Sequence, residues 1–278
     1  MNLFTQPMLR KPFFYVSKLS VVILASLLLS PQTLLAYRAS AAVGLGAAQA
    51  KSKVLRNVAQ SEPEKPAPTL TQVVQQVTVQ VVTDRNRGSG TLIGRQGKKY
   101  LVLTNQHVVR GGQRIQIRTY DGQNYTGQVM KEGVQGENDL ALVQFESEKS
   151  YTIPDIATAT PKQGLNIVSA GYAAESGQFL VSKGQLQQLP SQPLKEGYRL
   201  GYSGKVEQGM SGGPVFVFDT EENPEPFLIG INGRSAFPIV SNYAYADGTS
   251  PSAAEVQTMR QVNWGLPRSE ERRVGKEC

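Results

Sequence analysis

The central part of this sequence predicts an all-β fold, built either as a sandwich or as a pair of barrels. From Thr69 onward, short runs rich in Val, Ile, Tyr and Thr follow one another closely, and Gly, Asp, Asn or Pro usually separates them. Helical patterns are rare there. The segment Thr69–Val77 predicts one short helix, which either Thr69 or Thr71 would cap. Periodicity alone does not choose between a sandwich and barrels.

The expected strands share β-branched or aromatic residues and flanking turn residues. They are Val77–Val82, Gly90–Ile93, Tyr100–Thr104, Arg114–Thr119, Asn124–Val129, Asp139–Phe145, Leu165–Ala170, Phe179–Gln187, Tyr198–Tyr202, Gly213–Phe218 and Phe227–Asn232. Between two of them, Tyr120–Gln123 reads Y-D-G-Q and predicts the turn of a hairpin.

The N-terminal segment has the features of a secretory signal. It is basic, it has no acidic residue before Ala41, and its apolar run Leu19–Leu29 is short for a membrane span. The small residues Ala39–Ala41 are the best match to a cleavage site, and cleavage after Ala36 is a second option. We therefore predict that residues 1–41 are a signal and that the protein is exported to the periplasm or the cell exterior. It then has no stable membrane span. An uncleaved anchor is the alternative.

Two further segments are expected to lie outside the folded domain. Residues 42–70 pass through Ser61–Pro68, where closely spaced prolines disfavour helix and strand alike, so we interpret them as a linker. Residues 268–278 have no periodicity and resemble the translation of a sequencing adapter. We interpret them as a non-native tail, with a natural charged tail as the alternative.

Composition argues against two classes of function once these ends are set aside. The chain has 29 basic and 22 acidic residues, of which the first 41 residues hold four basic and the last eleven hold four basic and three acidic. The remaining 21 basic and 19 acidic residues nearly balance, so the charge is no argument for nucleic-acid binding. The chain has one histidine and one cysteine, Cys278, which lies in the suspect tail. A zinc site of the usual composition is therefore not expected, and we predict no metal and no cofactor.

The only histidine, His107, follows an expected strand and stands beside the polar run Thr104–Gln106. A buried structural histidine is the alternative, but an imidazole placed there is suited to proton transfer near neutral pH. Asp139 opens another expected strand, where a carboxylate can lie near a histidine at the edge of a β core. By itself it would be read as a turn residue.

The strongest single signal is the turn Gly209–Gly213, which reads G-M-S-G-G and leads into an apolar strand. Glycine allows a positive φ and a close approach of the main chain to a ligand. Such a turn can expose the hydroxyl of Ser211 while the amides of Gly209 and Ser211 point at one spot, as an oxyanion hole requires. A plain glycine-rich turn is the alternative.

The three candidate residues follow the chain order His107, Asp139, Ser211. This order resembles that of the trypsin/chymotrypsin-like serine peptidases. The similarity is strongest to bacterial members without disulfides, including the high-temperature-requirement proteases. The matching segments are T-N-x-H-V at Thr104–Val108, D-L-A-L at Asp139–Leu142, G-x-S-G-G-P at Gly209–Pro214, and the strands Gly88–Ile93 and Leu228–Asn232. They cover roughly Val77 to Pro267. The α/β-hydrolases differ, because their serine comes first and is followed by a helix.

This resemblance implies two packed six-stranded antiparallel barrels within a domain at 71–267, the first at about 71–155 and the second at about 160–267. We expect the second barrel to be truncated at its C-terminal end, because relatives continue beyond the segment that ends at Pro267. The resemblance also implies that His107 is the base, Asp139 orients it and Ser211 is the nucleophile of an endopeptidase acting on proteins or peptides.

The resemblance leaves specificity open. The expected border of the substrate pocket, by resemblance, comprises Lys205, Gln208, Ile231, Asn232 and Gly233. Met210 stands where digestive members have an aspartate that pairs with a liberated N-terminus. A thioether cannot form that ion pair, so we expect activation to be independent of such a cleavage. An inactive barrel pair that binds exported or envelope proteins is the alternative function, and the oligomeric state is left open.

Overall fold

The computed structural model describes residues 68–132, 138–218, 225–235 and 243–268. The predicted signal at 1–41, most of the predicted linker at 42–70 and the tail beyond Arg268 lie outside these residues, so those assignments stay predictions. Within the described ranges, no helix has the length and apolar character needed to cross a membrane.

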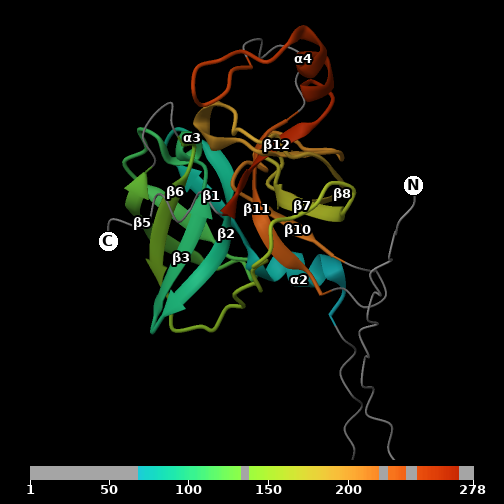
Figure 1. The fold of residues 1–278 in the computed structure, drawn as a ribbon. Helices are drawn as coiled ribbons and strands as arrows, with labels where there is room; N and C mark the ends of the chain where they lie inside the picture. The colour runs from blue at the N-terminus through green and yellow to red at the C-terminus, as the bar shows by residue number, and fades with distance from the viewer. Residues whose placement is uncertain (1–67, 133–137, 219–224, 236–242, 269–278) are drawn as a thin grey trace, which may run out of the picture. The chain divides into compact units, whose positions relative to one another are not determined.

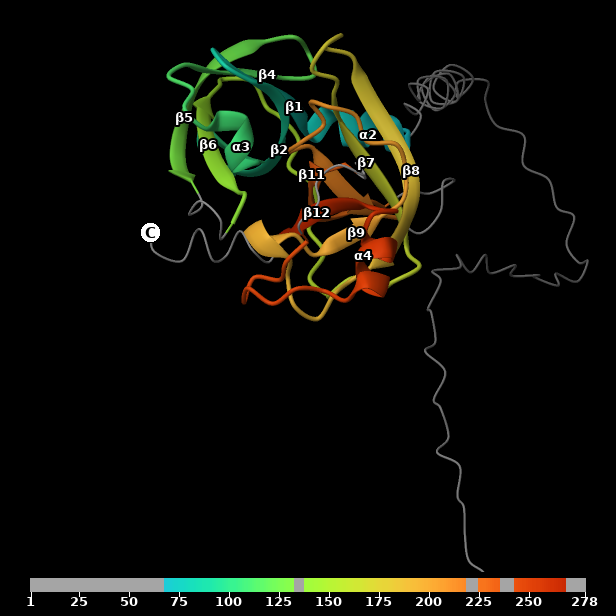
Figure 2. The same cartoon turned by 90° about the horizontal axis from the view of Figure 1, so that it is seen from above.

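Six antiparallel strands close into a first barrel in the order β1-β2-β3-β6-β5-β4. They are β1 (Thr78–Thr83), β2 (Arg87–Gln96), β3 (Lys99–Thr104), β4 (Ile115–Arg118), β5 (Asn124–Glu132) and β6 (Ala141–Glu146). Figure 1 labels the elements, and Figure 2 shows this barrel from above, with the short helix α3 (Gln106–Val109) at its mouth. The predicted turn joins β4 to β5, and Gly122 adopts a φ of 79° there.

A second set of six antiparallel strands closes in the order β10-β11-β12-β9-β8-β7. They are β7 (Asn166–Tyr172), β8 (Phe179–Gln188), β9 (Leu200–Tyr202), β10 (Pro214–Val217), β11 (Phe227–Arg234) and β12 (Asn263–Pro267). The all-β prediction is therefore confirmed, as are two six-stranded barrels.

The expected truncation of the second barrel is wrong. The segment Asn263–Pro267 is itself the closing strand, because β12 pairs with β11 on one side and with β9 on the other. Its residues Trp264 and Leu266 are buried in the large apolar cluster. The sequence pattern missed this strand, which is short and follows a helix, α4 (Ala253–Met259).

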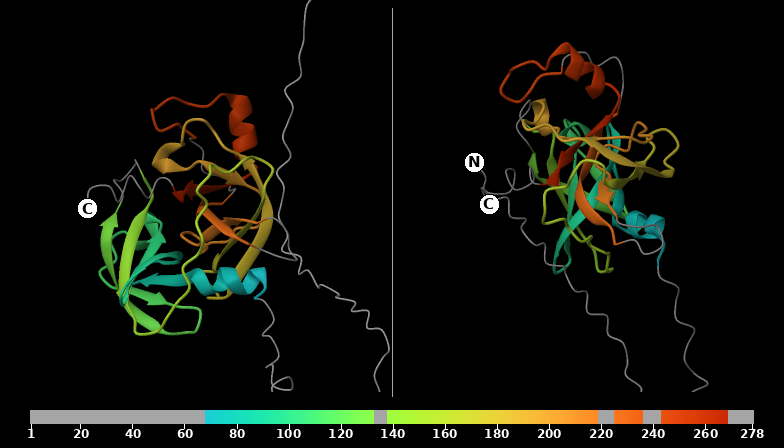
Figure 3. Two further views of the ribbon diagram at one scale, coloured as in Figure 1. Left: turned by 60° about the horizontal axis from the view of Figure 1, so that its bottom comes forward. Right: turned by 45° about the vertical axis from the view of Figure 1, so that its right-hand side comes forward.

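The helix predicted near residue 70 is present as α2 (Leu70–Val77). Thr69 caps it, since its side chain accepts from the amide of Gln72 while the Gln72 side chain accepts from the amide of Thr69. This reciprocal box satisfies amides that a helix start leaves unpaired. The helix starts at Leu70, one residue before the expected start of the domain at 71, and the domain boundaries stay predictions. Figure 3 shows α2 alongside the second barrel.

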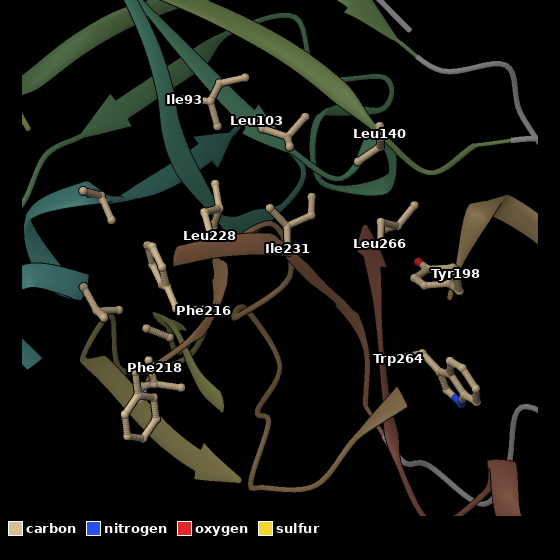
Figure 4. Close-up of a cluster of buried hydrophobic side chains, with 14 of the residues drawn as sticks. Ile93, Leu103, Leu140, Tyr198, Phe216, Phe218, Leu228, Ile231, Trp264 and Leu266 are labelled. Atoms are coloured by element: carbon tan, nitrogen blue, oxygen red, sulfur yellow. The ribbon is translucent and has the colours of Figure 1, made fainter. Parts of the chain in front are cut away.

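A single apolar cluster joins the two barrels. Figure 4 shows Ile93, Leu103 and Leu140 of the first barrel facing Leu228, Ile231 and Leu266 of the second. All six are at least nine-tenths buried. Burial of an aliphatic side chain stabilises a fold by about 1.5–3 kcal/mol, so this cluster fixes how the barrels sit against each other. Each barrel also has its own apolar interior.

Candidate active site

His107 lies where the first barrel ends and the cleft between the barrels begins. β3 stops at Thr104, and the chain turns into α3, in which Val108 and Val109 are buried in the first barrel. His107 directly precedes these two buried residues, and its side chain keeps 43% of its surface exposed.

Asp139 lies directly behind the imidazole and is almost completely buried. Its Oδ2 is 2.7 Å from Nδ1 of His107, and its Oδ1 accepts the backbone amide of His107 at 2.9 Å. A carboxylate can only accept, so Nδ1 must carry the proton of that bond. In the neutral imidazole, Nε2 then has a free lone pair. Burial raises the pKa of Asp139, but the hydrogen bond and charge of His107 and the hydroxyl of Tyr198 outweigh burial and lower the pKa below its usual value.

Ser211 lies across the cleft in the turn before β10. Its carbonyl accepts the amide of Ser89 from β2 at 2.8 Å. Ser89 also donates its hydroxyl to the carbonyl of Gly209 at 2.7 Å. The first barrel therefore holds the turn of the second at two points. The Ser211 hydroxyl donates to the carbonyl of Gly233 at 3.0 Å.

The glycine requirement of this turn is strict at Gly209, whose φ is 98°. A Cβ there would lie 2.3 Å from the amide nitrogen of Ala174, closer than real contacts allow. Among the residues that the structure describes, the amides of Gly209 and Ser211 make no backbone hydrogen bond. That these two amides form an oxyanion hole stays a prediction.

His107, Asp139 and Ser211 line one cavity of about 530 Å³ between the barrels. Of the five residues expected to border the substrate pocket, Gln208 and Gly233 line this cavity.

The structure places the other three elsewhere. Lys205 is exposed and pairs with Glu207, Ile231 is buried in the inter-barrel cluster, and Asn232 is fully buried. Asn232 donates to the carbonyls of Ala170 and Met210 and accepts the hydroxyl of Tyr202 at 2.6 Å. Its bond to the Met210 carbonyl anchors, from inside, the turn that holds Ser211, and Asn232 does not line the cavity.

The cavity also has a lining that sequence reasoning did not assign. These residues are Arg110, Glu196, Ser235, Tyr243 and Trp264, and the neighbours of the expected pocket residues, Val206, Glu207 and Arg234, line the cavity as well. They come from distant parts of the chain, from strands as well as loops, and no spacing in the sequence brings them together. Met210 is fully buried, and its sulfur accepts the amide of Glu207 at 3.3 Å.

Comparison with known proteins agrees with this architecture. The family described as trypsin-like peptidase domain matches residues 88–224. The "Probable periplasmic serine protease do/HhoA-like" of Haemophilus influenzae is 35% identical over 189 residues, which are 66% of this chain and 38% of that protein. The "Periplasmic serine endoprotease DegP" of Salmonella typhimurium is 27% identical over 182 residues, 64% of this chain and 36% of that protein. The chain thus spans little more than a third of the length of these relatives.

A solved structure shares the fold. The crystal structure of the serine endoprotease from Yersinia pestis superposes with a TM-score of 0.55 at 20% identity, covering 76% of this chain and 67% of that one. Together, the matched family model and the relatives support a trypsin-like serine peptidase of the DegP/HtrA type.

Proposed function

We propose that this protein is an exported serine endopeptidase that hydrolyses peptide bonds through an acyl-enzyme at Ser211. The observation that carries the proposal is the pairing of Asp139 with Nδ1 of His107, in one cavity with the hydroxyl of Ser211. The names of the curated relatives support a peptidase that acts in the periplasm on protein or peptide substrates.

The proposed reaction begins with a change of partner for Ser211. Its hydroxyl donates to the Gly233 carbonyl in the resting protein, and rotation of the hydroxyl group frees the proton for Nε2 of His107. His107 takes the proton as the oxygen attacks the peptide carbonyl, and Asp139 stabilises the imidazolium that forms. His107 then returns the proton to the leaving amine, and water hydrolyses the acyl-enzyme by the same steps.

The amides of Gly209 and Ser211 are proposed to hold the oxyanion that develops during attack. Backbone donors fixed in place before the reaction cost no reorganisation, and one such donor contributes on the order of 10²–10³ in rate. The holding of the Ser211 turn by Ser89 supports this role, because it makes the position of both donors depend on two rigid barrels.

A second candidate is a barrel pair that binds exported proteins without cleaving them. The hydrogen bond from Ser211 to Gly233 favours it, because a hydroxyl that stays there does not transfer its proton to His107. Labelling distinguishes the two functions. A serine-reactive phosphonate should add one adduct to the protein, and peptide mass spectrometry should place it on Ser211. An unlabelled wild-type protein, or a Ser211→Ala variant that is still labelled, would contradict the peptidase assignment.

A further inference from the structure

One oxygen of Asp139 accepts two hydrogen bonds. Oδ2 lies 2.7 Å from Nδ1 of His107 and also accepts the hydroxyl of Tyr198 at 2.5 Å. With Oδ1 bonded to the His107 amide, the carboxylate has three donors around it. Such an arrangement fixes the plane of the carboxylate, and therefore the direction from which it meets the imidazole.

Tyr198 belongs to the other barrel. It stands just before β9, and its neighbour Glu196 accepts the backbone amide of Asp139 at 2.9 Å. The segment from Glu196 to Tyr198 thus contacts both the main chain and the carboxylate of Asp139. Glu196 has a φ of 64°, and Gly197 one of 85°. A non-glycine residue in this left-handed region is strained, and such strain persists only where the surroundings impose the conformation.

The ring of Tyr198 is held from two sides. The guanidinium of Arg234 stands 5.1 Å from the ring centre and pairs with the carboxylate of Glu196. On another side, a Cβ on Gly233 would lie 2.1 Å from Cε1 of the ring. Only glycine at position 233 therefore leaves room for the ring, which is 2% exposed. A ring packed this tightly keeps its hydroxyl pointed at Asp139.

The hydroxyl of Tyr198 also stays protonated. Burial, together with the nearby Asp139 carboxylate, raises its pKa well above the ordinary value. The hydroxyl therefore remains a hydrogen-bond donor at neutral pH. Tyr198 is not among the residues that line the cavity, and its hydroxyl reaches the cavity through its bond to Asp139, which does line it.

We propose that Tyr198 is a positioning residue, through which the second barrel orients the carboxylate of Asp139 and thereby sets the tautomer and direction of the His107 ring. The expected effect on kcat rests on the peptidase function proposed above. The hydrogen bond from Tyr198 to Asp139 does not depend on that function. It also makes correct docking of the barrels a condition for an aligned histidine.

The test replaces Tyr198 by Phe, which removes only the hydroxyl and keeps the ring. We expect kcat on a peptide substrate to fall on the order of 10-fold, with KM within about twofold of wild type, because a hydrogen bond to a charged group is lost away from the substrate. Tyr100→Phe is the matched control. It removes another buried hydroxyl, which donates to the Lys149 carbonyl inside the first barrel, and should leave kcat unchanged.

A spectroscopic readout separates positioning from mere stability. The chain has one histidine, so selective ¹⁵N-histidine labelling gives a single Nδ1–H resonance. In the wild-type protein, an Overhauser contact should connect that proton with the Tyr198 hydroxyl proton. In Tyr198→Phe the resonance should shift or broaden through faster exchange, whereas in Tyr100→Phe it should match wild type.

The outcomes distinguish a failure of the role proposed for Tyr198 from a failure of the peptidase function. A wild-type protein that resists the phosphonate would defeat the peptidase assignment, and the resonance would still test the Tyr198 geometry. A wild-type protein that is labelled, combined with an unchanged kcat and an unchanged histidine resonance in Tyr198→Phe, would overturn the role of Tyr198. So would a missing Overhauser contact in the wild-type protein, which does not depend on how any variant folds.

Discussion

Replacing Asp139 by Asn lowers kcat on the order of 10⁴-fold and leaves KM nearly unchanged. Asp139 accepts from both the ring and the backbone amide of His107, and it accepts from Tyr198. An amide has only one acceptor oxygen, so one of these donors must meet an NH₂ group instead. If the NH₂ group faces the ring, it favours the tautomer with the proton on Nε2, and that nitrogen can no longer accept from Ser211.

Steady-state kinetics on a fluorogenic peptide checks this expectation, and Asp121→Asn serves as the matched control. Asp121 is also a first-barrel carboxylate, but it pairs with Lys149 and does not line the cavity. The control should keep wild-type kcat. An Asp139→Asn variant that retains more than about a tenth of wild-type kcat would show that the pair seen here does not direct catalysis.

Replacing Asn232 by Leu destabilises the protein by about 2–5 kcal/mol, because at least two buried hydrogen bonds are lost together. Leu is close in size to Asn, so the cavity effect is small. The Tyr202 hydroxyl loses its acceptor, and the carbonyls of Ala170 and Met210 lose a donor. The Met210 carbonyl lies next to Ser211, so activity should fall along with stability.

Urea unfolding followed by tryptophan fluorescence measures this change, since the chain has one tryptophan, the buried Trp264. Tyr202→Phe is the matched variant. It removes one of the same hydrogen bonds and should cost about 0.5–1.5 kcal/mol. A free energy of unfolding for Asn232→Leu within about 0.5 kcal/mol of wild type would mean that Asn232 does not anchor the turn that holds Ser211.

The fold was largely predictable because its strands carry a local signal. Eleven of the twelve strands coincide with Val-, Ile- and Tyr-rich runs bounded by turn residues, and Thr69 was one of the two expected caps of α2. The exception, β12, reads N-W-G-L-P and has only a weak strand pattern. Its identity as a strand is decided by its two neighbours in the closed barrel, which are distant in sequence.

The candidate site was also predictable only in part. Each of the segments around His107, Asp139 and Ser211 contains its own signal, and their order along the chain indicated the peptidase family. Ile231 and Asn232 were placed in the pocket by resemblance, although the structure buries Ile231 in the inter-barrel cluster and Asn232 behind the turn that holds Ser211. Tyr198 was recognised only as a strand residue. Its bond to Asp139 joins residues 59 positions apart, and no pattern in the sequence encodes that contact.

The most direct measurement of the central claim is cleavage of an unfolded protein by the purified chain and by its Ser211→Ala variant, followed by mass spectrometry of the fragments. The wild-type chain should produce internal fragments, and the variant should produce none at matched concentration, although its fold and thermal stability are unchanged. If both cleave at the same rate, or if neither cleaves while both bind the substrate equally, Ser211 is not the nucleophile of a peptidase.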